Sequence, residues 1–334
     1  MNLLPLYHPE IPAFLAALAD TPPMRRVAEV GMNCGCEYTS FPRFSNLQKY
    51  DRRVHSLGAA LIVWHFTGSA EQAAATLFHD VATPVFAHSI DFLRGDYLTQ
   101  ESTEAGTGEI LRGCPEITGL LGQIGLSADG VADYHRYPIA DNDPPRLSAD
   151  RLEYTLGNLV NFGFRTEADV RRHYGAVCVG ENEEGAPELC FWDLPAAKRF
   201  AMDAMKCARI YVADEDRYAM QRAAEVIALA FSRGVLSEED LYTTEPEVIA
   251  KLLSDELSDE GTAAAWRAFR ALSKMAEPGD PAAQGAWRVI PAKRRHIDPF
   301  VRDRGRLSRL DAEFAEEKRR FLMLDQTRPI AGIP

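Results

Sequence analysis

The sequence predicts an all-α, mostly helical protein with one small β-hairpin near residues 176–192. Three observations predict this class. Apolar residues recur at helical spacing over most of the chain, as in Val54 and Leu57. Helix-start signals precede such stretches, and Ser69 with Gln72 forms a capping box. A single stretch combines two apolar runs with a turn-rich centre, which limits the predicted strands to one hairpin.

The predicted helices follow one another along the chain. We expect them before residue 31, over about 51–66, 69–80, 88–95 and 148–162, from 194 to 275 with interruptions, and over about 308–322. Residues 31–46 lack periodicity and predict a loop. Pro84 disfavours helix at the residue before it, and so separates two of these helices. The hairpin is predicted where Ala-Val-Cys-Val and Leu-Cys-Phe-Trp flank GENEEGAPE.

Length and charge narrow the classes of function. A chain of 334 residues with 46% hydrophobic content can build a core at residues 1–215 and a helical extension, residues 216–334, packed on it. The formal net charge of −12 argues against general nucleic-acid binding, so any attraction for a phosphate compound must be local. No stretch approaches the roughly 18 apolar residues of a membrane span, which argues against a membrane role.

Cysteine use and the first residues indicate the compartment. Six cysteines are spread over the chain, and MNLLPLYHPE has no basic segment followed by an apolar one. We therefore expect a cytoplasmic protein with free thiols. Cys34 and Cys36 form the only close pair, and a structural zinc needs four ligands, so a zinc or redox site there is the weaker interpretation.

Four residues are candidate metal ligands: His55 in RRVHSLG, His79 and Asp80 in LFHDVATPVFAH, and Asp150 in SADRLEY. Imidazole and carboxylate together suit one divalent ion such as Mn, Fe, Ni, Zn or Mg, and open coordination positions allow hydrolysis. His79 and Asp80 are expected on a helix, where neighbours point roughly 100° apart. The alternative is that all four are ordinary helix residues in the core or in ion pairs.

The motifs around these residues occur in a fixed order. They are Asp20-Thr21-Pro22 followed by Arg26, Arg52-Arg53-Val54-His55-Ser56-Leu57-Gly58, the segment from His79 to Asp91, and Asp150-Arg151-Leu152-Glu153-Tyr154. Over residues 8–160 the chain resembles the HD superfamily of metal-dependent phosphohydrolases, most closely the dGTPase or dNTP triphosphohydrolase branch. The resemblance implies a helical HD-domain fold in which His55, His79, Asp80 and Asp150 bind the metal.

The same resemblance assigns further roles. His88 and Asp91 correspond to the catalytic pair, and positions three apart do share a helix face. Asp91 is expected to raise the pKa of His88. Arg52 is expected to bind a phosphate, and Tyr154 to line the sugar site. Gln100 and Glu101 are further candidate substrate-binding residues.

The chain also departs from the family pattern at positions that concern the substrate. Thr83 stands where the family has a second histidine, and Gln100-Glu101 stands where it commonly has His-Glu. The segment that selects the sugar in the family aligns with residues 32–35. Two imidazoles that would help to bind a triphosphate are therefore absent.

The expected function is hydrolysis of a phosphoester or phosphoanhydride of a dNTP-like or NTP-like nucleotide by metal-activated water. The alternatives are a nucleoside monophosphate or cyclic-nucleotide phosphohydrolase and a non-catalytic sensor that binds nucleotide or metal. Family likeness implies a homo-oligomer, with the C-terminal extension as its interface. The basic run from Lys293 to His296 is either a solvated patch or an arm that reaches the phosphate of the same or a neighbouring subunit.

Overall fold

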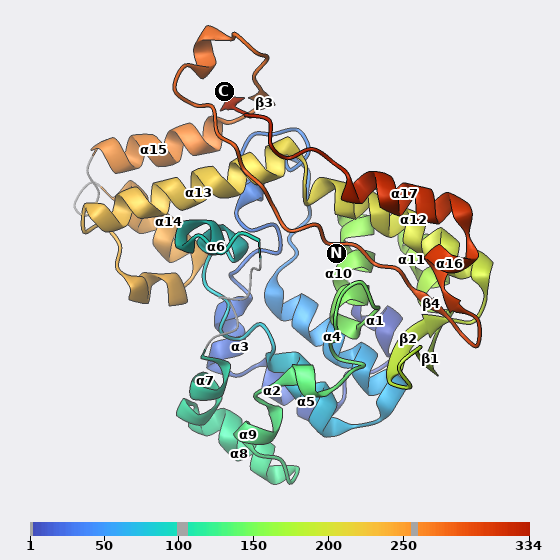
Figure 1. Cartoon of the computed structure of the whole chain (residues 1–334). Coiled ribbons are helices and arrows are strands. Elements are labelled where there is room, and N and C mark those ends of the chain that lie inside the picture. Colours follow the sequence, from blue (N-terminus) through green and yellow to red (C-terminus); the bar gives the residue numbers. More distant parts are fainter. Residues whose placement is uncertain (1–2, 99–105, 255–259) are drawn as a thin grey trace.

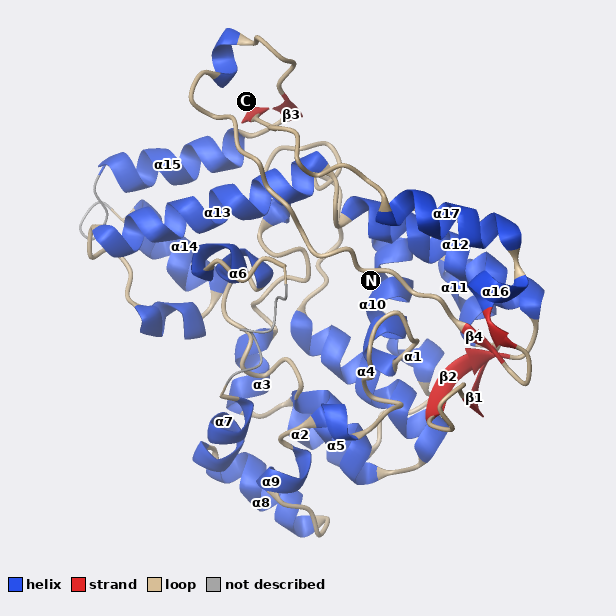
Figure 2. Cartoon of the chain, in the orientation of Figure 1, coloured by secondary structure: helices blue, strands red, loops and turns tan. Residues whose placement is uncertain are grey.

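The computed structural model describes residues 3–98, 106–254 and 260–334. Within these ranges the protein is mostly helical with few small strands, which confirms the predicted class (Figure 2). Among the described helices, none has both the length and the apolar character needed to cross a bilayer.

One hydrophobic cluster joins the N-terminal and central helices to the end of the chain. Its α-helices are α1 (Leu4–Tyr7), α2 (Ala13–Ala19), α3 (Pro22–Val27), α4 (Arg52–Thr67), α5 (Ala70–Phe78), α7 (Thr107–Gly113), α8 (Pro115–Gln123), α9 (Ala128–Val131), α10 (Ala149–Asn161), α11 (Glu167–Tyr174), α12 (Leu194–Ile210), α16 (Leu307–Leu310) and α17 (Ala312–Leu322). The predicted helices at 51–66, 148–162 and 308–322 match α4, α10 and the α16–α17 pair.

A second hydrophobic cluster lies beside the first, toward the upper left of Figure 1. Its α-helices are α6 (His88–Arg94), α13 (Asp214–Ser232), α14 (Glu245–Leu253) and α15 (Glu260–Ala271). The loop of residues 31–46 packs here through Phe41 and Phe44, and includes the short 3-10 helix η1 (Cys36–Tyr38). The remaining 3-10 helices described are η2 (Tyr134–Arg136), η3 (Glu238–Tyr242) and η4 (Pro281–Ala283).

The predicted hairpin is present as β1 (Val177–Glu181) and β2 (Pro187–Phe191), with Cys178 opposite Cys190. The sequence predicted no strands besides this hairpin, whereas the structure adds two strands from the C-terminal region to the same sheet. Strand β4 (Phe300–Val301) pairs in parallel with β2, and β5 (Gly305–Arg306) pairs with β4. A separate pair joins β3 (Lys274–Met275) to β6 (Gly332–Ile333).

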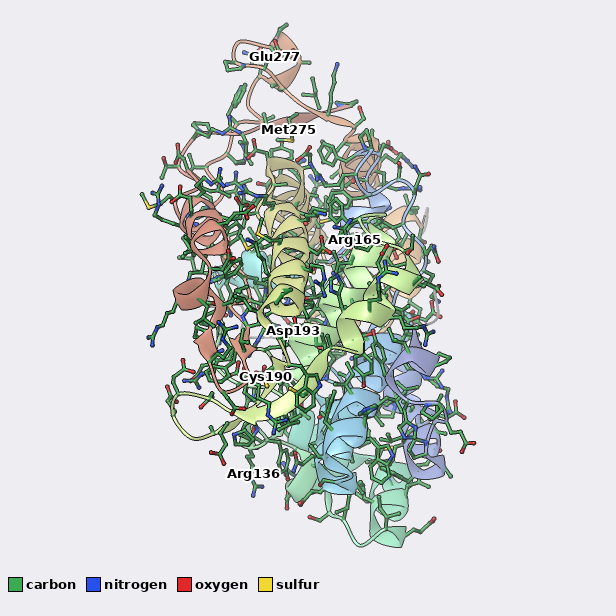
Figure 3. The ribbon with its side chains drawn as sticks, turned by 90° about the vertical axis from the view of Figure 1, so that its right-hand side faces the viewer. Arg136, Arg165, Cys190, Asp193, Met275 and Glu277 are labelled. Atoms are coloured by element: carbon green, nitrogen blue, oxygen red, sulfur yellow. The ribbon has the colours of Figure 1, made fainter. Side chains whose placement is uncertain are left out.

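Figure 3 shows how these sheets are placed relative to the helices. Cys190 lies on the hairpin next to Asp193, whose side chain accepts a hydrogen bond from Ala196 N at 2.7 Å and begins α12. Met275 and Glu277 lie at the opposite end of the molecule from Arg136. The sheet that contains β3 therefore lies near one end of the molecule, and the hairpin lies between that end and the other.

Candidate metal centre and its cavity

Two helices and the turn after a third bring the four candidate ligands together. His55 is in the first turns of α4, which begins where the Asp51 side chain accepts from Val54 N at 3.0 Å. Asp150 is in the first turn of α10, where Ser148 caps Arg151 N. The two Nε2 atoms of His55 and His79 lie 3.2 Å apart. Asp150 Oδ1 lies 3.0 Å from the first of these and 3.5 Å from the second.

Asp80 completes the group from the turn that follows α5. Its Oδ2 lies 3.5 Å from His79 Nε2 and 3.9 Å from His55 Nε2. The expectation that both His79 and Asp80 lie within a helix is wrong, because α5 ends at Phe78 and His79 is its C-cap. Tight turns in which Val81 N donates to Phe78 O and Thr83 N to Asp80 O replace helical bonds before Pro84. This bend lets neighbouring side chains face the same point.

The rings of both histidines are oriented by bonds on their far side. His55 Nδ1 lies 2.6 Å from Glu153 Oε2, one turn after Asp150 on α10. His79 Nδ1 lies 2.7 Å from the Thr76 carbonyl, so Nδ1 is the protonated nitrogen and Nε2 offers a lone pair. A carboxylate or carbonyl on the second nitrogen is the usual support for a histidine that binds a metal.

Glu153 is itself buried and held by two phenols. Tyr7 donates to its Oε1 at 3.2 Å, and Tyr50 donates to its Oε2. Gly58 on α4 faces it, and a Cβ there would come 2.7 Å from Glu153 Oε1. The glycine of the HSLG motif therefore leaves the room that this carboxylate needs beside His55.

Arg52 and Thr83 hold the Asp80 carboxylate. Arg52 Nη1 donates to Oδ2 at 2.7 Å and Thr83 Oγ1 donates to Oδ1 at 2.8 Å. Burial alone would raise the pKa of Asp80, but Arg52 and the two histidines more than offset it, so the pKa is lowered. Asp80 is therefore ionised, as a metal ligand must be.

The donor set fits a divalent cation. Two imidazole nitrogens bound to one ion at about 2.1 Å and near right angles would lie about 3 Å apart, close to the distance between these Nε2 atoms. Burial opposes charge on His55, yet hydrogen bonds with Asp150 and Glu153 raise its pKa to about 10. Burial likewise opposes charge on Asp150, but the two histidines lower its pKa. The site thus concentrates negative charge that protons, or a cation, must balance.

The four side chains open onto a cavity of about 580 Å³ between the two hydrophobic clusters. Arg52 and Tyr154 line the same cavity, as does His88. Gln100 and Glu101 lie outside the described residues. The wall also includes the basic run from Lys293 to His296 together with Arg146 and Arg151.

His88 and Asp91 form a pair at the start of α6. His88 Nδ1 lies 2.8 Å from Asp91 Oδ2, and Asp91 is fully buried. Phe86 and Ala87 have positive φ angles of 58° and 44°, which turn the chain sharply before His88. Non-glycine residues in this region are strained and gather at functional sites.

Glu245 supports this turn from α14, because its Oε1 accepts from Phe86 N at 3.1 Å. The expected rise in the pKa of His88 is wrong. Burial lowers this pKa, Asp91 only partly opposes burial, and Arg295 and Arg52 lower the pKa as well, so that it lies at about 4.

Sequence reasoning gave Glu153 no role and did not link the basic run from Lys293 to His296 with His88. Glu153 belongs to the motif that contains Asp150, and its spacing of three residues places it on the same helix face, which is the signal that could have identified it. Arg295, in the basic run, has Nη2 3.3 Å from His88 Nε2. A guanidinium has only donors, so Nε2 accepts this bond and Nδ1 carries the proton shared with Asp91.

Comparisons with known proteins agree with a metal centre of this kind. No family model matches the chain. The chain is 24% identical over 207 residues to the uncharacterized protein YdhJ of Bacillus subtilis. The aligned residues make up 61% of this chain and 60% of YdhJ. The chain is 23% identical over 272 residues to the metal-dependent phosphohydrolase cns2 of Cordyceps militaris, covering 79% and 73% respectively. A distant homologue is thus named as a metal-dependent phosphohydrolase, and neither name refers to a dNTP triphosphohydrolase.

Proposed function

We propose that the protein is an HD-type metal-dependent phosphohydrolase. The observation that carries this proposal is the convergence of His55, His79, Asp80 and Asp150 at the wall of a cavity rich in cations. A bound divalent ion would lower the pKa of a water molecule and neutralise charge on a phosphoryl oxygen. The four side chains would hold that ion, and Glu153 and Thr76 keep the imidazole lone pairs directed at it.

The side chains of the cavity supply the remaining functions. Arg52 holds Asp80 in place and presents a buried cation to the cavity. Asp91 fixes the proton of His88 on Nδ1, which leaves Nε2 as the atom that can take up and deliver a proton. A dianionic phosphate beside this ring would raise the pKa of His88, because negative charge favours the imidazolium. His88 then serves as the proton donor to the leaving oxygen.

A nucleotide is the proposed substrate. Tyr154 and Tyr211 line the cavity with Phe162 and offer aromatic faces to a base or sugar, next to the cationic wall. A monophosphate is the second candidate, favoured by Thr83. The side chain of Thr83 is buried and donates to Asp80, so it is not directed at a substrate as the family histidine would be.

The test combines metal content with turnover. Wild type, His88→Ala and the control His8→Ala, which lies outside the cavity, are assayed with nucleoside mono-, di- and triphosphates and cyclic nucleotides in the presence of Mn, Co, Ni or Mg. We expect a bound metal in all three proteins and a turnover that falls about 10²- to 10⁴-fold only in His88→Ala. Metal without turnover on any substrate would favour the sensor, and a protein that takes up no metal would exclude the proposal.

A further inference from the structure

Residues 290–298, called here the strap, cross the molecule without regular secondary structure. Figure 1 shows this segment as an extended orange-red trace that runs from the side of α13 to β4. The strap passes the cavity, and Lys293, Arg294, Arg295 and His296 form part of its wall. It approaches from the second hydrophobic cluster, whereas the four candidate metal ligands lie on α4, on α10 and in the turn after α5, which are elements of the first cluster.

Hydrogen bonds anchor the strap at both ends. At its start, Arg217 donates to the Ile290 carbonyl, and Ala292 N donates to Gln326 Oε1 at 2.8 Å. At its end, Asp298 N donates to the Pro145 carbonyl at 2.8 Å, and Lys318 Nζ donates to Asp298 Oδ2 at 2.7 Å. The intervening cations are therefore held at the cavity and are not on a loose arm.

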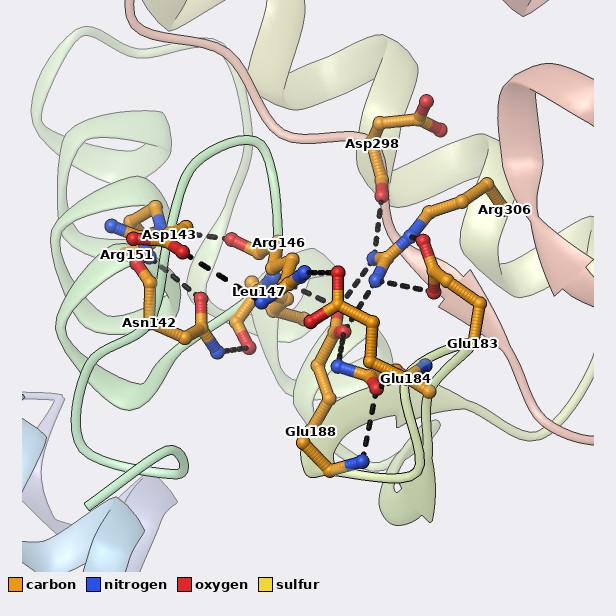
Figure 4. A network of polar contacts seen from close by, with 12 residues as sticks. Asn142, Asp143, Arg146, Leu147, Arg151, Glu183, Glu184, Glu188, Asp298 and Arg306 are labelled. Carbon is orange, nitrogen blue, oxygen red and sulfur yellow. Dashed lines mark hydrogen bonds and ion pairs between the residues drawn. The ribbon is translucent and has the colours of Figure 1, made fainter. Parts of the chain in front are cut away.

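Arg306 connects the end of the strap at Asp298 to the hairpin by hydrogen bonds. It donates to Glu183 and Glu188 of the hairpin region and to the Asp298 carbonyl at 3.2 Å (Figure 4). Glu188 in turn accepts from Leu147 N at 3.2 Å, which belongs to the loop before α10. The strap is thus fixed relative to the helix that carries Asp150.

The charges of the cavity are distributed unevenly. Arg52 pairs with Asp80 at 2.7 Å and Arg151 with Asp141 at 3.0 Å. Arg146 pairs with Glu184 and lies 4.0 Å from Asp143. Residues 293–296 add the cations Lys293, Arg294 and Arg295 to the same wall, on a chain whose net charge is −12. A cluster of cations at one wall of a cavity in an acidic protein favours an anionic ligand there.

Arg295 links the strap to the proposed proton donor, since its Nη2 donates to His88 Nε2. We propose that the strap is the second half of the phosphate site, in which Arg295 and Lys293 bind the phosphate dianion of an ester opposite the metal ligands. Arg295 then exchanges its bond to His88 for phosphate oxygens, which its planar fork can hold in pairs. This inference rests on the proposed function and assigns it a phosphate ester as substrate class.

The test measures binding of inorganic phosphate by isothermal titration calorimetry, with metal-free and Mn-loaded protein. Arg295→Ala and Lys293→Ala are compared with wild type and with Arg304→Ala. Arg304 is an exposed arginine of the same C-terminal segment that does not line the cavity, so it matches the loss of one charge. Arg295→Lys keeps the positive charge but loses the planar guanidinium that can make two parallel hydrogen bonds to phosphate. It serves as a second variant if the alanine variant does not fold.

We expect phosphate affinity to fall about 10- to 100-fold in Arg295→Ala, less in Lys293→Ala, and to stay unchanged in Arg304→Ala. Arg295→Lys is expected to lie between wild type and the alanine variant. The inference is overturned if phosphate does not bind to wild type, or if it binds to Arg295→Ala as tightly as to wild type. This holds even if hydrolysis is observed. Phosphate binding that depends on Arg295 in a protein without turnover upholds the strap site and rejects the hydrolase.

Discussion

Glu153 acts on the candidate metal centre through His55, without being one of the four convergent groups. Its carboxylate bonds to Nδ1 and therefore fixes which nitrogen of the ring faces the site. Tyr7 donates to Oε1 and Tyr50 to Oε2, so both oxygens of the carboxylate are bonded and its orientation is held. An acceptor-only carboxylate is required here, because all three partners can donate to it.

Glu153→Gln is expected to weaken metal binding by about 10- to 100-fold while the fold is retained. The amide has the same shape, but one of its two ends is a donor that cannot accept from Tyr or His. Metal affinity is measured by titration of the metal-free protein, and circular dichroism checks the fold. Glu167→Gln, at an exposed position on α11, is the matched control. Equal affinity in all three proteins would contradict a role for Glu153 in orienting His55.

Asp216 is a second buried carboxyl group, and it lines the cavity on the side of α13. Burial raises its pKa to about 7, and the Cys36 thiol at 3.8 Å and Arg43 only partly oppose this. The folded protein therefore favours the protonated carboxyl. Its contribution to stability is present below the ordinary pKa of 3.8 and is lost as the pH rises through about 7.

Asp216→Asn removes this titration and keeps the shape of the neutral acid. Between pH 5 and pH 8 we expect the thermal midpoint of wild type to fall by a few degrees more than that of Asp216→Asn. Calorimetry across this range measures the difference between the two proteins, which cancels other titrating groups. Parallel curves would contradict a pKa of Asp216 that is raised into this pH range.

At the scale of elements, the crossing of α4 and α10 sets the geometry of the site. The two helices supply His55 and Asp150 and are in contact, with Gly58 of α4 facing Glu153 of α10. Gly157 on α10 leaves room for the Tyr50 ring in the same way, because a Cβ at this position would lie 2.5 Å from the Tyr50 hydroxyl. Two glycines thus let two helices and a buried phenol–carboxylate pair pack together.

Gly58→Ala should destabilise the protein by about 1–3 kcal/mol and also weaken metal binding, because its methyl group would displace Glu153 from His55. Urea denaturation and metal titration measure the two effects. Gly119→Ala in α8 is the matched control, since a Cβ there meets nothing within 4 Å and alanine favours a helix. A Gly58→Ala protein as stable as Gly119→Ala would show that the helices can move apart at no cost.

Sequence patterns predicted the elements that have strong local signals. Helices α4 and α10 follow from apolar periodicity, and the hairpin follows from two apolar runs around a turn. These signals are local in the chain, so the sequence alone carries them. The grouping of His55 with Asp150 is expected only from the resemblance of the ordered motifs to the HD superfamily, because periodicity does not say which helices meet.

Other features could not be predicted because distant contacts determine them. A two-residue strand such as β4 has no periodicity to detect, and it forms only by pairing with β2, which lies far earlier in the chain. The low pKa of His88 arises from burial against a strap more than 200 residues away in sequence, whereas the adjacent Asp91 suggested the opposite shift.

At the scale of the whole molecule, the end of the chain returns to the first hydrophobic cluster. Val301, Leu307, Phe314 and Phe321 are fully buried there. Strand β4 pairs with β2, and α17 packs on α12, so residues 216–334 cover a face that the first part of the chain would otherwise expose. The strap lies between these contacts and the second cluster.

A fragment of residues 1–215 should therefore fail to reach the native state by itself. Burying each large apolar side chain stabilises the folded state by about 1.5–3 kcal/mol. The free energy lost with the four residues above is therefore comparable with the whole free energy of unfolding of a typical domain. We expect the fragment to aggregate or to unfold without a cooperative transition, and to become soluble when residues 216–334 are co-expressed. Calorimetry and analytical gel filtration measure both states. A fragment with a sharp, reversible transition would identify residues 1–215 as an independent domain, and the metal affinity of that fragment would then report on the centre without the strap.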